Sequence, residues 1–306
     1  MVARLVIAGV LLAVVVCAPP ATSLSGGPEG PPLRVWAQQR PARIVSTSPS
    51  ITEVLFALGL GNRVVGVSSY CRYPEQVTAL PDVGSFLRPS TELIARLRPD
   101  LVIVNRASND VARQLAALRL PAIAVDEARS LASIYAMVRG IGRAAGIADR
   151  ADALVAELQA RLDRVRAGAG GRPPRKVLIV VSRSAGGLSD LVAVGRGSYL
   201  HELVGVAGGV NVLDDPGLPS YPRISMETVI RLAPDVIVDA ADMGDTVEEH
   251  VRRQPVTEAL WRRQTSVAAA RTGGVHAVTS DAFVVPGPRM VEAAETLAGW
   301  LRDAGR

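Results

Sequence analysis

Ser90-Thr-Glu-Leu-Ile-Ala-Arg-Leu-Arg-Pro-Asp-Leu-Val-Ile-Val104 returns in the second half of the chain as Ser225-Met-Glu-Thr-Val-Ile-Arg-Leu-Ala-Pro-Asp-Val-Ile-Val-Asp239. The two stretches align without a gap, and each predicts a short helix, a Pro-Asp turn and a β-branched strand. The agreement extends upstream through a Ser-aromatic-x-Arg pattern, formed by Ser85, Phe86 and Arg88 in the first copy and by Ser220, Tyr221 and Arg223 in the second. An internal repeat of this length predicts that the two halves are copies of one folding unit.

Both halves surround the repeat with short apolar strands that alternate with helical patterns. In the first half we expect strands at residues 43–46, 64–67, 101–104 and 122–125, and helices at 51–58, 91–97 and 110–118. In the second half we expect strands at 177–181, 236–239, 267–270 and 275–278, and helices at 199–206, 226–232 and 289–301. Strands separated by helices of this length form parallel β-α units. The sequence therefore predicts an α/β fold of two similar Rossmann-like lobes with parallel sheets.

A single long backbone helix is expected between the two lobes, at residues 149–167. Leu154, Leu158, Leu162 and Val165 recur on one helical face, and the Gly/Pro-rich stretch at 168–174 ends the helix. A helix of this length spans roughly 28 Å at 1.5 Å per residue, which is enough to join two lobes. The alternative for this helix is an ordinary crossover within one sheet.

The first residues predict a segment that is separate from the fold. Arg4 is followed by an unbroken apolar run at residues 5–16 and then by small residues, which is the pattern of an export signal. We expect a periplasmic or otherwise extracytoplasmic protein after cleavage, with a lipid anchor at Cys17 as the alternative to a freely exported chain. The expected organisation is a signal peptide at 1–25, a Pro/Gly-rich linker at 26–41, an N-terminal lobe at 42–147, the connecting helix and its terminator at 148–172, and a C-terminal lobe at 173–306.

The composition is that of a globular chain and argues against several functions. Of the 306 residues, 48% are apolar and 21% are charged, and the two cysteines are too few for a disulfide scaffold, so Cys71 is expected to be a buried free thiol. The net charge is +5, but the arginines are scattered and do not alternate with stacking aromatics, so nucleic acid is not an expected partner.

Motifs for catalysis are missing from the sequence. It has no Gly-x-Ser-x-Gly elbow, no phosphate loop and no His-Glu-x-x-His site, and His201, His250 and His276 are isolated. We therefore expect no catalytic residues, no metal site and no cofactor. An exported metal-dependent enzyme, with a zinc site assembled from distant histidines, is the alternative from another functional class.

Loops that follow strands and precede helices are the expected binding region, because ligands of parallel sheets bind beyond the carboxyl ends of the strands. Ser48 and Pro49 directly follow the first expected strand. Phe86 and Tyr221 occupy matching loops of the repeat. These two rings either wall a cleft shared by the lobes, which would suit a large and flat ligand, or fill the core of their own lobe.

Polar residues at helix starts have a structural explanation and a functional one. Ser50 and Glu53 have the spacing of a capping box, which would start the helix at Ser50. Glu92 and Glu227 lie in matching first turns, where an acid stabilises the helix dipole. Their strict repetition favours a second role, in which two symmetric surface acids dock onto a symmetric partner.

Motifs in both halves also occur in the order and register of a known family. The first half carries Arg43-Ile-Val-Ser-Thr-Ser-Pro-Ser-Ile-Thr-Glu53, Val65-Gly-Val-Ser-Ser-Tyr70 and Val83-Gly-Ser-Phe86, and the second carries Gly208-Gly-Val-Asn211, Ser220-Tyr-Pro-Arg-Ile-Ser-Met-Glu227 and Thr279-Ser-Asp281. Over residues 42–305 the chain resembles the periplasmic cobalamin- and iron-siderophore-binding proteins that serve ABC importers. It looks most like the cobalamin binders of this helical-backbone class.

The resemblance implies capture of cobalamin or a related corrinoid between two lobes and delivery to the permease subunits of an ABC importer in the inner membrane. It implies a monomeric protein that performs no chemistry, and it implies that Glu92 and Glu227 pair with arginines of the permease. The cleft aromatics of the family are often tryptophans, whereas the matching positions here hold Phe86, Tyr221 and Ala282. A ferric siderophore or haem is therefore the alternative ligand.

The expected ligand-binding residues follow from their positions after strands and from the family resemblance. Arg106 and Arg183 follow strands, at positions where they would meet an anionic ligand, and Asp281 and Phe283 belong to the second-half motifs of the family. The complete expected set is Ser48, Pro49, Tyr70, Phe86, Arg106, Arg183, Tyr221, Asp281 and Phe283.

Overall fold

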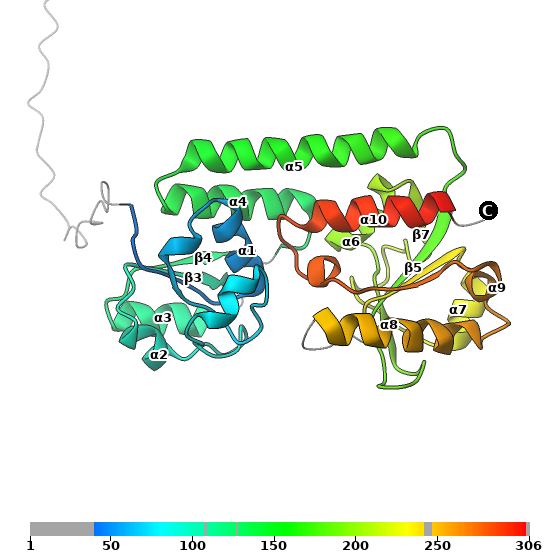
Figure 1. Cartoon of the computed structure of the whole chain (residues 1–306), viewed down its shortest axis with the longest axis horizontal. Helices are drawn as coiled ribbons and strands as arrows, with labels where there is room; N and C mark the ends of the chain where they lie inside the picture. The colour runs from blue at the N-terminus through cyan, green and yellow to red at the C-terminus, as the bar shows by residue number, and fades with distance from the viewer. Residues whose placement is uncertain (1–39, 107–108, 127, 242–246, 304–306) are drawn as a thin grey trace, which may run out of the picture. The chain divides into compact units, whose positions relative to one another are not determined.

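Two β-sheets organise the structure, a computed structural model that describes residues 40–106, 109–126, 128–241 and 247–303 (Figure 1). The expected signal peptide, Cys17 and most of the expected linker lie outside the described residues. The first sheet has four strands, all parallel, in the order β2-β1-β3-β4. They are β1 (Ile44–Ser46), β2 (Val64–Gly66), β3 (Leu101–Asn105) and β4 (Ala122–Val125).

Both faces of the first sheet are apolar, as a parallel sheet between helices requires. Successive residues of a strand point to opposite faces. Ile44 and Ile103 accordingly join one buried cluster with helices α1 (Pro49–Ala57) and α4 (Leu131–Ala144). Val45 and Val102 join another cluster with helices α2 (Thr91–Arg96) and α3 (Asn109–Ala117). We call this sheet with its helices the first lobe.

The second sheet is mixed rather than parallel, which corrects the expectation for this lobe. Its strands are β5 (Arg175–Ser182), β6 (Leu191–Ala193), β7 (Gly209–Asn211), β8 (Arg223–Ile224), β9 (Val236–Asp239) and β10 (Val275–Ala277). Strands β10, β9, β5 and β7 pair in parallel, whereas β6 runs antiparallel to both β5 and β8. The connection from β5 to β6 is too short for the crossover that a parallel neighbour needs, so β6 folds back as a hairpin.

Helices cover both faces of this second sheet as well. The clusters contain residues of α6 (Tyr199–Val206) and α10 (Met290–Asp303) on one face, and of α7 (Met226–Leu232), α8 (Val247–Arg262) and α9 (Ala268–Thr272) on the other. The strand expected at residues 267–270 is wrong, because most of this stretch is helix α9. The sheet, its helices and the 3-10 turn η4 (Asp281–Phe283) form the second lobe.

The internal repeat corresponds to the same pair of elements in each lobe. Ser90 is the N-cap of α2, which leads into β3, and Ser225 is the N-cap of α7, which leads into β9. Each serine side chain accepts a hydrogen bond from the third backbone NH of its helix, at 3.3 Å in both lobes. The prediction of two similar α/β lobes is confirmed.

The long helix between the lobes is α5 (Ala148–Ala169), close to the bounds expected from the sequence. Val155, Leu158 and Leu162 are buried. Figure 1 shows α5 running past α4 and then past α10, and it packs against both. The apolar face of α5 belongs to one continuous cluster that contains Ile44 of the first sheet and Val177 of the second. The two lobes therefore share a core.

Candidate ligand-binding site

A cavity of about 550 Å³ is lined by residues of both lobes. The lining of the first lobe comes from the ends of β1 and β3 and from nearby loops, namely Ser48, Pro49, Ser50, Phe86, Asn105, Ala128 and Arg129. The lining of the second lobe is Gly197, Tyr199, Pro219, Ser220, Tyr221, Val284, Val285 and Pro286. A cavity of this size falls within the range of pockets for small molecules, roughly 300–1,000 Å³.

A hydrogen-bonded turn presents Ser48 and Pro49 to the cavity. Thr52 Oγ1 donates to Ser46 Oγ at 2.7 Å, and Ser46 Oγ donates to the carbonyl of Ser48 at 3.2 Å. Helix α1 begins at Pro49 with Ser48 as its N-cap, so the start expected at Ser50 is wrong. Proline suits the first helical position because it lacks the NH that would have no partner there.

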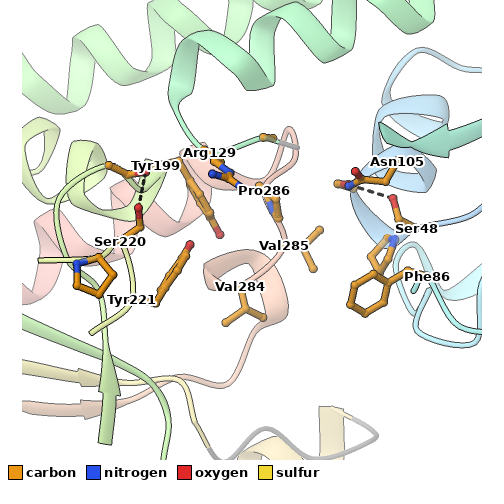
Figure 2. Close-up of a pocket in the computed structure, with 15 residues that line it drawn as sticks. Ser48, Phe86, Asn105, Arg129, Tyr199, Ser220, Tyr221, Val284, Val285 and Pro286 are labelled. Carbon is orange, nitrogen blue, oxygen red and sulfur yellow. Dashed lines mark hydrogen bonds between the residues drawn. The ribbon is translucent and has the colours of Figure 1, made fainter. Parts of the chain in front are cut away.

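Two aromatic rings face the cavity from opposite lobes. Phe86 is 37% exposed and Tyr221 is 46% exposed, so neither ring fills the core of its lobe. Figure 2 shows Phe86 beside Ser48 on the side of the first lobe, with Tyr221 across the cavity near Ser220. Tyr70 is not a lining residue, but its ring stands edge-on to that of Phe86 with the centroids 5.5 Å apart.

The wall of the second lobe rests on buried Tyr199 and on the segment Val284–Pro286. Tyr199 donates its hydroxyl hydrogen to the carbonyl of Phe283 at 2.9 Å. Burial raises the pKa of Tyr199 well above its usual value, with smaller contributions from Tyr221 and Glu53, so the hydroxyl stays protonated as a donor. The hydroxyl of Ser220 donates to the carbonyl of Gly197 at 3.3 Å, which holds the loop that carries Tyr221.

Besides Tyr70, four of the expected ligand-binding residues do not line the cavity. Arg106 forms an exposed ion pair with Asp126. Arg183 is interior, with its side chain 1% exposed and Nε 2.8 Å from Asp239 Oδ2. Asp281 pairs with Arg289 at 2.7 Å. Phe283 is buried and stacks on Trp300 with the centroids 5.6 Å apart.

Several lining residues are not among those expected from the sequence. Asn105 ends β3 at the same sheet edge as Ser48, so the rule that ligands bind at carboxyl ends of strands could have found it. Arg129, Tyr199 and the segment Val284–Pro286 carry no comparable signal, because loops and the start of α6 bring them to the cavity from both lobes.

Glu92 and Glu227 are exposed in the first turns of α2 and α7. Glu92 pairs with Arg96 at 2.6 Å within its own helix. A hydrogen bond from Ser225, and then one from the backbone NH of Glu227, lowers the pKa of Glu227. Both carboxylates are therefore positioned on equivalent surfaces of the two lobes.

The described residues offer neither a metal site nor a membrane span. Within residues 40–303, leaving out the undescribed gaps, no three His, Cys, Asp or Glu side chains gather where they could hold a metal ion. No helix in this part of the chain is long and apolar enough to cross a membrane. Cys71 is buried as expected.

Known proteins that resemble this chain are described as periplasmic or substrate-binding proteins. A family model described as "Periplasmic binding protein" matches residues 44–273. An uncharacterised ABC transporter substrate-binding lipoprotein, YvrC of Bacillus subtilis, is 29% identical over 86% of this chain and 81% of the relative. A vitamin B12-binding protein of Vibrio cholerae is 27% identical over 86% of this chain and 90% of the relative. The apo structure of the periplasmic haem-binding protein RhuT from Roseiflexus sp. RS-1 is 30% identical, with a TM-score of 0.73 over 86% of this chain and 99% of that one.

Proposed function

The chain belongs to the periplasmic binding protein family, and from this premise we propose that it is the exported substrate-binding protein of an ABC importer, with cobalamin or a related corrinoid as its ligand. It binds and releases this ligand without chemical change. The comparisons do not favour the alternative of an exported metal-dependent enzyme. The expected signal peptide at 1–25 and the choice between a free and a lipid-anchored protein belong to the same proposal.

The main support for a flat, partly apolar ligand is the pair of exposed rings, Phe86 and Tyr221, on opposite sides of one cavity. Exposed aromatic side chains are unfavourable in water and become favourable when a flat apolar surface covers them. A corrin ring has such a surface, and its polar side groups would meet Ser48, Ser220 and Asn105 at the rim. The vitamin B12-binding relative supports this ligand.

Haem, or a ferric siderophore, is the second candidate ligand. It is supported by the 30% identity to a haem-binding protein of known structure. It is also supported by Arg129 in the lining, since a guanidinium group is suited to binding the carboxylates of a haem.

Calorimetric titration of the purified chain with cyanocobalamin, haemin and a ferric hydroxamate tests the proposal. We expect one-to-one binding of cyanocobalamin, with a dissociation constant in the micromolar range or below and weaker binding of the other two. If haemin or the ferric hydroxamate bound tightly instead, that compound would replace cobalamin as the proposed ligand, and the proposed role in transport would stand. No heat with any of the three would contradict the proposed ligand classes.

We propose further that Glu92 and Glu227 dock the loaded protein onto permease arginines. The double variant Glu92→Ala/Glu227→Ala is expected to reduce uptake of labelled cobalamin by cells at least about tenfold, because two buried charge pairs would be lost at that interface. Its affinity for the ligand in solution should stay within about twofold, since neither carboxylate lines the cavity.

The matched control for docking is Asp110→Ala. Asp110 is also an exposed acid in the first turn of a helix, α3, but it lies outside the repeat. If uptake falls equally in this variant and in the double variant, the effect comes from helix stability and docking by the two glutamates is refuted.

A further inference from the structure

Arg289 connects the two lobes through a buried ion network. Its Nη2 pairs with Glu53 Oε1 of α1 in the first lobe and lies 2.7 Å from Asp281 Oδ1 of η4 in the second. The Glu53 side chain is 2% exposed and that of Arg289 is 9% exposed. We propose that this Glu53–Arg289–Asp281 network fixes the cavity wall Val284–Pro286 against α1, so that Glu53 and Arg289 are positioning residues for the ligand. The inference rests on the proposed function only for the identity of that ligand.

The wall lies between the two anchor points in the sequence. Asp281 and Arg289 flank Val284, Val285 and Pro286, so the ion pair between them closes the segment into a loop. Backbone bonds tie the loop internally, because the NH groups of Val284 and Val285 each donate to the carbonyl of Asp281 at 2.9 Å. The loop is compact by itself, and Arg289 attaches it to the first lobe through its pair with Glu53.

The same helix serves both sides of the cavity. Helix α1 carries Pro49, which lines the cavity on the first-lobe side, and one turn later it carries Glu53. Helix α1 therefore holds the cavity wall of the second lobe through Glu53 and also supplies Pro49 to the facing wall of the first lobe. A change in the Glu53–Arg289 contact would alter the spacing between the two linings, and with it the fit of a rigid flat ligand.

The surroundings leave the network little room. A Cβ atom at Gly287 would lie 3.0 Å from Glu53 Oε2. The guanidinium of Arg289 covers the ring of Tyr73, with Cζ 3.8 Å from the centroid, which adds a cation–π contact from the first lobe. Glu53 Oε2 and Arg289 Nε are buried and have no hydrogen-bond partner among the described residues. Among the described residues, Arg289 is therefore the hydrogen-bond donor on which the Glu53 carboxylate depends.

Burial raises the pKa of Glu53 to about 7, although the hydrogen bond and charge of Arg289 act in the opposite direction. The other ionisable groups that act on Glu53 are Asp281 and Glu292, and Glu53 in turn raises the pKa of Cys71 and Tyr199. Buried ion pairs of this kind contribute little net stability, and in some proteins they fix one geometry among several. That property suits a positioning role.

Distances between the lobes test the network without any ligand. Spin labels at Leu118→Cys and Val256→Cys would sit on exposed positions, one in each lobe, while Cys71 is buried. We expect a narrow distance distribution in the otherwise native chain and a broadened or shifted one in Glu53→Gln, which keeps the shape of the side chain. The control is Glu295→Gln, which breaks the Arg161–Glu295 pair between α5 and α10. This pair includes no residue of the network or the wall, so the variant should leave the distribution unchanged.

A second variant distinguishes loss of positioning from loss of stability as the cause of a broadened distribution. Glu53→Gln/Asp281→Asn/Arg289→Met removes all three charges of the network, so no unpaired buried charge remains and the chain should fold at least as stably as the native one. We expect this variant to melt at or above the native temperature and still to show the broadened distribution. If the network only stabilised the fold, a variant that melts at or above the native temperature would show the native distance distribution.

Affinity completes the test, with cyanocobalamin and haemin as probes. For whichever probe the native chain binds, Glu53→Gln should raise the dissociation constant at least about tenfold, because a preorganised wall is lost, and Glu295→Gln should change it less than about twofold. Unchanged distances and unchanged affinity in both Glu53 variants would overturn the inference. If the native chain binds neither probe, cobalamin and haem are excluded as ligands, and the distance measurement alone decides the role of the network.

Discussion

An Asp239→Ala variant is expected to lose about 3–5 kcal/mol of unfolding free energy, the cost of leaving a buried charge without its partner. The Asp239 side chain is fully buried, and its Oδ2 accepts hydrogen bonds from Arg183 Nε at 2.8 Å and from Trp261 Nε1 at 2.7 Å. Its Oδ1 accepts a third, from the backbone NH of Ala241 at 3.0 Å. Removal of the carboxylate leaves the Arg183 guanidinium in the interior of the second lobe.

Urea unfolding at neutral pH measures this loss. The matched control is Asp152→Ala, which breaks an ion pair with Arg139 that is largely exposed and should cost less than about 1 kcal/mol. An Asp239→Ala variant no less stable than this control would show that Arg183 finds another partner or leaves the interior.

The double variant Phe86→Ala/Tyr221→Ala is expected to weaken binding of the transported ligand at least about a hundredfold. Each ring is exposed in the free protein and faces the cavity, so each would be covered by a bound macrocycle. Truncation of a central aromatic contact typically costs about 2 kcal/mol or more, which is roughly thirtyfold for each ring before any coupling between them.

Calorimetry with the ligand that the native chain binds would measure this effect. Tyr221→Phe keeps the ring and should bind within a fewfold of the native chain. Leu118→Ala removes an exposed apolar side chain of the first lobe that does not line the cavity, and should have no effect. Near-native affinity of the double alanine variant would refute the assignment of these rings to the ligand.

The repeat allowed much of the fold to be predicted, because each copy contains a capped helix and a buried strand within one short stretch. Ser90 and Ser225 cap equivalent helices, and the long helix α5 follows from its regular leucine spacing. Elements held by distant partners were predicted less well. Val267 alone is β-branched in the stretch 267–270, and the alanines that follow it favour the helix α9 that they form. The antiparallel strand β6 is fixed by its pairing with β5 and β8.

The site residues also differ in whether local sequence or a distant partner decides their position. Ser48, Pro49, Phe86 and Tyr221 could be placed because they follow strands or occupy matching loops of the repeat. Arg183 also follows a strand, but its charge is neutralised by Asp239, 56 residues further along the chain. The position of such an arginine is decided by a partner that local sequence does not reveal.

Since one apolar cluster runs from the first sheet through α5 into the second, each lobe encloses only part of its core. A polypeptide with a single copy of the repeat would leave part of that cluster in water, and would be expected to aggregate or to pair with another copy. The two lobes should accordingly unfold in a single cooperative transition, although each has its own sheet. If the halves arose by duplication, the ancestral unit would have needed a second copy of itself as a partner, and fusion of the genes would have made that partnership permanent.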